Sequence, residues 1–473
     1  MTALRAHQTL QAAAARRAVA KTTRRHVHLS SRPLVLVGYH LAGDPGAPLG
    51  LVWGTNRDEE PHCMVVAEPR NRALRFEALD EFASVFLTYL SEFEALEATD
   101  ICRDAPQLVV PNRATGEWLG GIVGRFTRNL RIDGDAPPPA SVPLAGKHLS
   151  FFGDQLPGSS LMVAATDALV THWQTGQLPS EDLNLAALLG WIDPPAGLDG
   201  PAAAREGEQG PPAGPDSDPN WDAEDLTELI KDWHAADDDD RPAQAAVRGD
   251  LEAEIRAQLM PAWLDCWRAL DQLGSLPAAG HVASRWLSDR EAWTAHCARI
   301  GEGRAFFRNI PTPVQAATRL RILESRTEEL QREMAWDDPL VMAALVATGE
   351  ALAGRVVTVD PDRRTPNANG RRQRRPLVVI EPSLAFARPA GTNLFLSTHP
   401  SVKLEVLPDD ASGLIRAEVR KGANQSTTVG LLPTPGDEVV LSPYGRPEFY
   451  QRSHVDEIPW THLQIVDDDV EES

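Results

Sequence analysis

One segment interrupts the hydrophobic patterning of the chain and constrains how the rest can fold. Residues 193–245 are rich in Pro, Gly and Ala, and residues 193–240 hold fifteen acidic side chains against only Arg205 and Lys231. A segment of this composition has almost no side chains that could build a core. The chain has 473 residues, which is long enough for two or three domains. The segment therefore predicts a linker between separately folded parts.

The fold class predicted from this boundary is multidomain α+β. In chain order we predict a basic N-terminal arm (1–32), a mixed α/β domain (33–192), the acidic Pro/Gly-rich linker (193–245), a helical domain (246–353), a small β-barrel domain of the OB or SH3 type (354–466) and an acidic tail (467–473). Apolar residues at a four-residue spacing, beginning at Leu251, indicate the helical domain.

The mixed α/β domain is compatible with a degenerate RNase H-like fold. Three strand patterns precede a long amphipathic helix, and a fourth strand pattern and a second helix follow. Nucleases with this layout hold two metal ions with carboxylates from the first strand, the helix and the fourth strand. The helix offers Glu77, Asp80 and Glu81, but Asp44 lies beyond the first strand and the fourth strand ends at Asn112. We therefore expect any such site to be inactive.

The C-terminal domain switches to short strand patterns of period two. Closure into a barrel is favoured because it removes exposed strand edges. The predicted strands are Val356–Val359, Leu377–Ile380, Leu394–Ser397, Val402–Leu407, Leu414–Val419, Glu438–Leu441 and His462–Val466. This strand content, together with the Arg-rich loops, resembles the small β-barrel inserted in superfamily 1 helicases.

The same domain resembles PD-(D/E)xK nucleases at one point. In that family an Asp and a Glu on adjacent strands bind a metal ion, and a Lys two residues further on positions the attacking water. Here Asp409 is followed by Glu418, but Arg420 stands where the Lys would be and Asp409 falls in a turn. A polar hairpin is therefore the favoured interpretation.

The functional pattern that stands out most is a dense run of arginines in a loop of the predicted barrel. Guanidinium groups bind phosphates through bidentate hydrogen bonds and release counterions as they do so. We therefore predict nucleic-acid binding, including single strands, with Phe386, Phe395, Phe449 and Tyr450 as candidate stacking platforms. The alternatives are a solvated loop, or one paired with the acidic linker or tail of the chain. The arginines are Arg363, Arg364, Arg371, Arg372, Arg374 and Arg375, and residues 363–375 contain no acid.

Other chemistry has little support in the sequence. The chain has no HExxH pattern, no phosphate-binding glycine motif and no His pair at helical spacing, so we predict no metal and no cofactor. No apolar run approaches the roughly 18 residues of a membrane span. The cysteines are scattered without a CxxC pair, which is typical of reduced thiols and indicates a cytoplasmic protein. They are Cys63, Cys102, Cys266 and Cys297.

These patterns favour a non-catalytic protein. The preferred hypothesis is an accessory subunit of a nucleic-acid-processing complex, in repair or defence. It would bind nucleic acid through the barrel, and a helicase or nuclease through the rest of the chain. A metal-dependent nuclease is one alternative, and an interaction scaffold without nucleic-acid contact is another.

Overall fold

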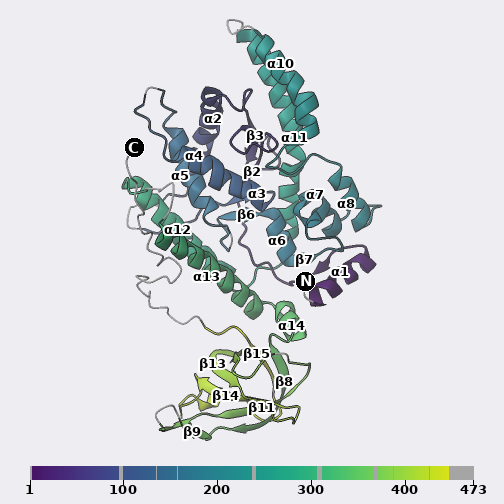
Figure 1. Ribbon diagram of the computed structural model, residues 1–473, viewed down its shortest axis with the longest axis vertical. Coiled ribbons are helices and arrows are strands. Elements are labelled where there is room, and N and C mark those ends of the chain that lie inside the picture. Colours follow the sequence, from purple (N-terminus) through teal and green to yellow (C-terminus); the bar gives the residue numbers. More distant parts are fainter. Residues whose placement is uncertain are drawn as a thin grey trace, which may run out of the picture. The chain divides into compact units, whose positions relative to one another are not determined.

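The computed structural model describes residues 3–94, 100–134, 136–156, 158–236, 241–305, 312–366, 370–386, 388–425 and 427–446 (Figure 1). The chain divides into two compact units. The N-terminal unit is His7–Asn309, and the C-terminal unit is Ile310–Ser473 together with Met1–Ala6. The mixed α/β, multidomain class predicted from the sequence is therefore confirmed, but this division differs from the six predicted segments.

A five-stranded sheet forms the centre of the N-terminal unit. Its order is β4-β3-β2-β5-β6. The β2–β3 and β3–β4 pairs are antiparallel, whereas β2–β5 and β5–β6 are parallel. The strands are β2 (Leu34–His40), β3 (Pro48–Gly54), β4 (His62–Val65), β5 (Leu108–Val110) and β6 (Met162–Ala164), and a separate two-stranded sheet pairs β1 (Val19–Ala20) with β7 (Trp173–Gln174).

Helices accompany the sheet throughout the N-terminal unit. Asn71, for example, starts α2 by accepting hydrogen bonds from the backbone N–H groups of Ala73 and Leu74. The helices up to residue 309 are α1 (Ala3–Ala15), α2 (Arg72–Ser91), α3 (Arg113–Glu117), η1 (Trp118–Val123), α4 (Gly124–Thr127), α5 (Ser141–Gly153), α6 (Ala165–His172), η2 (Glu181–Leu183), α7 (Leu185–Ile192), α8 (Gly200–Glu208), α9 (Pro219–Trp221), η3 (Asp222–Leu226), α10 (Thr227–Ala235), α11 (Arg241–Gly274) and α12 (Val282–Gly301).

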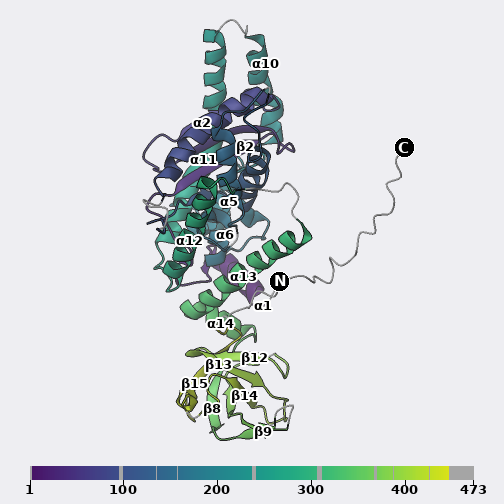
Figure 2. The ribbon, with the colours of Figure 1, turned by 90° about the vertical axis from the view of Figure 1, so that its left-hand side faces the viewer.

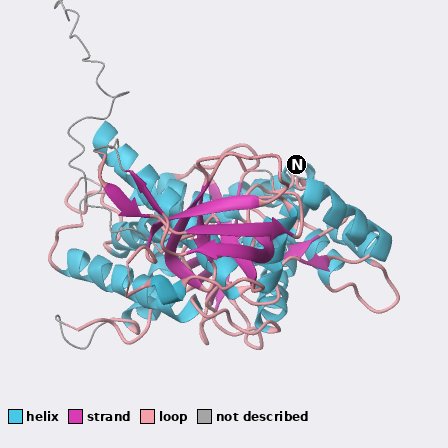
Figure 3. Ribbon diagram, turned by 90° about the horizontal axis from the view of Figure 1, so that it is seen from below, coloured by secondary structure: helices cyan, strands magenta, loops and turns pink. Residues whose placement is uncertain are grey.

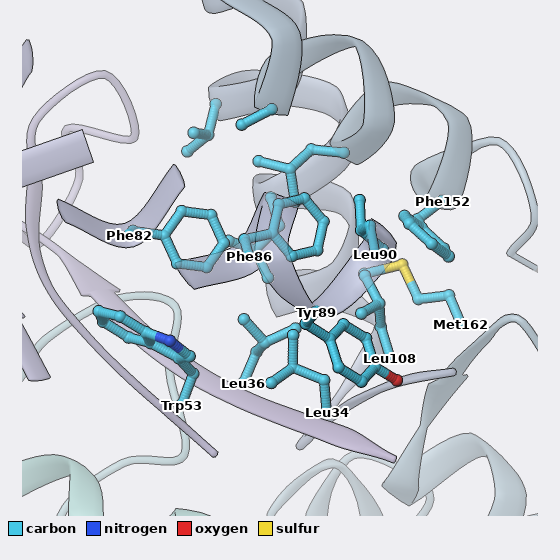
Figure 4. Close-up of a cluster of buried hydrophobic side chains, with 14 of the residues drawn as sticks. Leu34, Leu36, Trp53, Phe82, Phe86, Tyr89, Leu90, Leu108, Phe152 and Met162 are labelled. Carbon is cyan, nitrogen blue, oxygen red and sulfur yellow. The ribbon is translucent and has the colours of Figure 1, made fainter. Parts of the chain in front are cut away.

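The sheet is covered on both faces, which makes three layers. Because side chains alternate along a strand, Leu34 and Leu36 of β2 face one core, and Val35 and Val37 face the other. The first core includes side chains of α2, α5 and α12, such as Phe82 (Figure 4). The second core includes side chains of α6, α7 and α11. All seven residues of β2 are buried, as expected for a strand enclosed by two helical layers.

The predicted linker, 193–245, carries helices that pack on the N-terminal unit. Its Ala and Gly residues let backbones approach closely. A Cβ atom on Gly190 of α7 would lie 2.8 Å from the backbone of Ala203 in α8, and Gly207 of α8 is equally close to Ala186. The small side chains of this segment therefore stabilise the packing because they let the helix backbones approach closely, and not because they fill a large volume.

From His7 onward the predicted arm, 1–32, belongs to the N-terminal unit, and so does the first part of the predicted helical domain. Arg16 forms an ion pair with Asp199, and β1 pairs with β7. The chain from 246 to 353 is divided between the two units, because α11 and α12 contribute Trp263 and Trp293 to the two cores of the sheet. Helices α10 and α11 lie side by side in both views (Figures 1 and 2).

The C-terminal unit contains the closed barrel predicted from the sequence. Six strands close in the order β11-β14-β13-β12-β15-β8, and all their pairings are antiparallel. Figure 3 draws the strands of both units in magenta. The barrel strands are β8 (Leu352–Asp360), β11 (Leu377–Pro382), β12 (Asn393–Leu396), β13 (His399–Val406), β14 (Ile415–Lys421) and β15 (Glu438–Ser442); helices α13 (Pro313–Asp337) and α14 (Pro339–Ala347) precede them and η4 (Val429–Leu431) precedes β15.

Two predicted features of this region lie outside the described residues. They are the seventh strand, His462–Val466, and the acidic tail, 467–473. The remaining six predicted strands each overlap one strand of the barrel. Among the helices that the structure describes, none is both long and apolar enough to cross a bilayer.

Two neighbouring glycines test the close packing of η1 against α5. A Cβ on Gly120 would lie 2.5 Å from the Cα of Gly153, whereas a Cβ on Gly121 meets nothing within 4 Å. We expect Gly120→Ala to lower the free energy of unfolding by about 2–3 kcal/mol, because the added methyl group would force the backbones of η1 and α5 apart. Gly121→Ala should leave it unchanged or raise it by about 0.5 kcal/mol. Urea unfolding followed by tryptophan fluorescence measures both, and equal effects would contradict the close contact.

Candidate nucleic-acid interface

The predicted arginine loop forms a two-stranded ribbon beside the barrel. Strands β9 (Arg364–Pro366) and β10 (Arg372–Arg374) pair antiparallel, with Arg364 opposite Arg374 and Pro366 opposite Arg372. Directly opposed residues project from the same face, and so do residues two apart along a strand. Arg364, Arg372 and Arg374 therefore share one face of the ribbon.

Two other arginines anchor the ribbon to the barrel. The N–H of Arg375 donates to the carbonyl of Arg363 at 2.8 Å, which extends the pairing by one residue and places both side chains on the opposite face. Arg363 forms an ion pair with Glu418 of β14, and Arg375 donates from Nη1 to the carbonyl of Arg420 at 2.6 Å. Both side chains are half-buried.

The six predicted arginines are therefore not equivalent. Arg374 is half-buried and donates to the carbonyl of Pro361 at 2.8 Å and to the carboxylate of Asp362 at 2.6 Å. Arg364, Arg371 and Arg372 are exposed. Within the described part of the chain, no carboxylate forms an ion pair with Arg364 or Arg372.

A buried carboxylate holds this arrangement together. Glu418 is 3% exposed on the outer side of β14, between the inward-facing Ala417 and Val419. It forms ion pairs with Arg363 and Arg420. A carboxylate as buried as Glu418 requires such partners, because an unpaired buried charge is costly.

The network extends to a second strand. Arg420 donates to both carboxylate oxygens of Glu405 on β13, at 3.0 Å and 2.7 Å. The hydrogen bond to Glu405 is the main reason that the pKa of Arg420 is raised above its usual value. Asp409, the other acid of the PD-(D/E)xK pattern, accepts from the N–H of Ala411 in the turn before β14. Both acids of that pattern therefore have structural partners.

The helix acids of the N-terminal unit also have partners. Glu77 and Glu81 of α2 form ion pairs with Arg248 of α11, and the carboxylate of Asp80 accepts from the hydroxyl of Ser141. A metal ion at Glu77 or Glu81 would have to compete with the guanidinium of Arg248.

The remaining predicted positions of that site are likewise occupied. Asp44 forms an ion pair with Arg70. Asn112 follows β5, where its Oδ1 accepts from the N–H of Thr115 at 2.8 Å and its Nδ2 donates to the carbonyl of Gly214 at 2.7 Å. In the described residues, no group of three or more His, Cys, Asp or Glu side chains could hold a metal ion.

Of the predicted stacking platforms, the two that the structure describes, Phe386 and Phe395, are half-buried. Phe386 is half-buried and packs against the barrel core. The ring of Phe395 lies against Gly445, where an added Cβ would come within 2.2 Å of it. Phe449 and Tyr450 lie outside the described residues. The described part of the barrel therefore offers guanidinium groups and not aromatic faces.

A buried histidine pair is the main titratable cluster away from the barrel. The Nε2 atom of His296 lies 3.1 Å from Nδ1 of His148. Burial lowers the pKa of His148 to about 4 and that of His296 to about 2. Both rings are therefore neutral at neutral pH and share one proton across the contact. His148 also lines a pocket of about 440 Å³ between α2, α5 and α12.

The cysteines are all unpaired, as expected for reduced thiols: Cys63, Cys102, Cys266 and Cys297. Burial raises the pKa of the Cys63 and Cys297 thiols to about 12, so neither is a reactive thiolate at neutral pH.

Sequence reasoning missed the anchoring network of the ribbon. The available signal was the alternation of Arg416, Glu418 and Arg420 on the outer face of a predicted strand. That alternation indicates a charged outer face, but not which side chains pair across it.

Comparison with known proteins does not extend these observations. No family model, no curated protein and no solved structure matches the chain.

The two carboxylates that share Arg420 provide a matched test of the network. Glu418 is buried, whereas the side chain of Glu405 is 30% exposed. We expect Glu418→Gln to reduce local stability of β14 by about 2–3 kcal/mol, because two guanidiniums lose a buried counter-charge. Glu405→Gln should cost less than about 1 kcal/mol, since water screens that pair. Hydrogen exchange of peptides covering 415–421 measures the difference, and faster exchange in Glu405→Gln than in Glu418→Gln would contradict it.

Proposed function

We propose that this chain is a non-catalytic accessory protein of a nucleic-acid-processing complex, which binds the phosphate backbone through the β9–β10 ribbon. The observation that carries the proposal is the placement of Arg364, Arg372 and Arg374 on one face of that ribbon. Arg364 of β9 lies directly opposite Arg374 of β10, and Arg372 lies two residues before Arg374 on β10.

This placement favours an anionic ligand on physical grounds. Like charges directly opposite each other across two strands are destabilising. Asp362 offsets part of the charge through Arg374, but its side chain is 84% exposed and the pair is screened by water. A phosphate on this face would accept from several guanidinium groups at once and release counterions.

The rest of the ribbon supports a site held in position. Arg363 and Arg375 tie its opposite face to β14, so the binding face does not depend on a freely moving loop. A pre-positioned set of donors loses less conformational entropy when it binds than a mobile loop does. The proposed ligand class is nucleic acid, with single strands included.

The N-terminal unit supports the non-catalytic part of the proposal. The strand order β4-β3-β2-β5-β6, with only β3 antiparallel to its neighbours, favours an RNase H-like fold. The acids near its expected site pair with Arg248, Arg70 and Ser141, which argues against metal binding. We likewise propose that the barrel is of the OB or SH3 type, and that a helicase or nuclease partner contacts the rest of the chain in the cytoplasm.

Nucleic-acid binding is tested by removing Arg364 and Arg372, the two exposed ribbon arginines that form no ion pair with any described residue. We expect Arg364→Ala/Arg372→Ala to weaken binding to a labelled 30-nucleotide single strand about tenfold or more. The dependence of log affinity on log salt should become shallower by about 1.4, because two phosphate contacts are lost. Fluorescence anisotropy between 50 and 200 mM salt measures both quantities.

A control variant separates site binding from net charge. Arg355→Ala/Arg446→Ala also removes two positive charges from the barrel unit, but Arg355 lies in the first half of β8 and Arg446 follows β15, so neither belongs to the ribbon. It should keep the wild-type salt slope. Equal loss in the two variants, or no binding by the wild type to either single-stranded or duplex probes, would reject the ribbon as the site.

The nuclease alternative makes a separate prediction. We expect the wild type to leave a labelled strand intact in 5 mM Mg²⁺ or Mn²⁺, because the acids that could hold metal are paired with protein cations, hydroxyls or backbone N–H groups. A time course on a denaturing gel detects cleavage. Metal-dependent cleavage that disappears in Glu81→Ala or in Glu418→Ala would establish the alternative and overturn the non-catalytic proposal.

A further inference from the structure

The pocket of about 440 Å³ between α2, α5 and α12 lies within the N-terminal unit, and the proposed function does not use it. Its volume falls in the range of roughly 300–1,000 Å³ that is usual for small-molecule sites. All three helices contribute to its lining, as does the segment before β5. The apolar side chains of that lining include Leu87, Leu90, Cys102, Leu144, Cys297 and Ile300.

One buried polar side chain also lines this pocket. His148 of α5 is 7% exposed, and its Nδ1 lies 3.1 Å from Nε2 of His296. The Nε2 of His148 hydrogen-bonds to none of the described residues, so this nitrogen is available to a ligand. Burial lowers the pKa of His148 to about 4, and the ring is therefore uncharged at neutral pH. Because buried polar atoms normally have a partner, this nitrogen favours a bound molecule that supplies one.

The charged side chains of the lining all have the same sign. Glu94, Asp100 and Glu302 line the pocket and are exposed, so they mark its opening. Glu302 forms an ion pair with Arg304, whereas Glu94 and Asp100 form none with any described residue. The described lining contains no Lys or Arg.

The negative charge at the opening acts on the wall of the pocket. Burial, the neighbouring thiol of Cys102 and the carboxylate of Glu94 all raise the pKa of Cys297, to about 12. Lys147 and Arg299 lie on α5 and α12 beside lining residues, but neither belongs to the lining. Carboxylates at the opening of an apolar pocket attract a cationic ligand and repel an anionic one.

We propose that this pocket binds a small apolar molecule that carries one protonated amine. The apolar body packs against Leu87, Leu90 and Leu144, and the ammonium group lies at the opening, beside Glu94 and Asp100. The uncharged histidine ring on α5 offers a hydrogen bond to a polar group on that body. The inference rests on the apolar lining, its charge and the buried histidine, and it does not depend on nucleic-acid binding.

Two ligands with nearly the same apolar body and opposite charges test the proposal. Isothermal titration calorimetry of the full-length protein at about pH 7.5 measures the dissociation constants of 2-phenylethylamine and of 3-phenylpropanoate. We expect the amine to bind at least tenfold more tightly than the carboxylate. Glu94→Gln/Asp100→Asn should weaken binding of the amine at least threefold. Glu206→Gln/Glu208→Gln, which removes two exposed charges from α8, should leave it within about twofold.

Protection of a thiol shows where the amine binds and requires no variant. Cys297 lines the pocket and Cys63 does not, but both thiols are half-buried and burial raises the pKa of both to about 12. Methyl methanethiosulfonate modifies thiols, and peptide mass spectrometry measures the rate at each cysteine. The amine at about ten times its dissociation constant should slow modification of Cys297 about tenfold and leave Cys63 within about twofold.

Four outcomes would overturn the proposal. They are the absence of amine binding, equal or tighter binding of the carboxylate, equal effects of the two double variants, and equal protection of Cys297 and Cys63.

Discussion

The N-terminal unit depends on strand β2 being buried on both faces. A strand whose seven residues are all buried cannot be completed by a single helical layer, so it requires cover on each side. Trp293 of α12 fills one face, and Trp263 of α11 fills the other. Both tryptophans come from the region that sequence patterning assigns to a separate helical domain. The requirement of the sheet for two layers explains why this region divides between the two units.

The C-terminal unit depends in a similar way on one buried charge. Glu418 lies at the outer surface of the barrel but is buried, because Arg363 and Arg420 cover it. The pair with Arg363 fixes which face of the β9–β10 ribbon is turned to the barrel. Arg363 and Arg375 thereby anchor the ribbon, Arg374 is half-buried and pairs with Asp362, and Arg364, Arg371 and Arg372 are exposed.

In both units, carboxylates considered as metal ligands pair with arginine side chains. Glu77 and Glu81 of α2 pair with Arg248, and Glu418 of β14 pairs with Arg363 and Arg420. Such pairing stabilises a carboxylate without leaving it available to a cation. In the described residues these carboxylates are therefore engaged with other groups of the protein.

The sequence by itself determined the elements whose burial follows a local period. The alternation in the C-terminal region predicted seven strands, of which six overlap strands of the barrel and the seventh lies outside the described residues; the amphipathic pattern of the long helix predicted α2. Both patterns depend on one element facing one core. Only the tertiary structure decided that the Pro/Gly/Ala-rich segment packs on the N-terminal unit, because Gly190 allows the backbone of Ala203 to approach closely. The partners of the charged residues were also decided there, since Arg363 and Glu418 are 55 residues apart and Glu81 and Arg248 are 167 apart. Periodicity reports which face of an element is apolar, whereas ion pairing depends on which distant side chains the completed fold brings together.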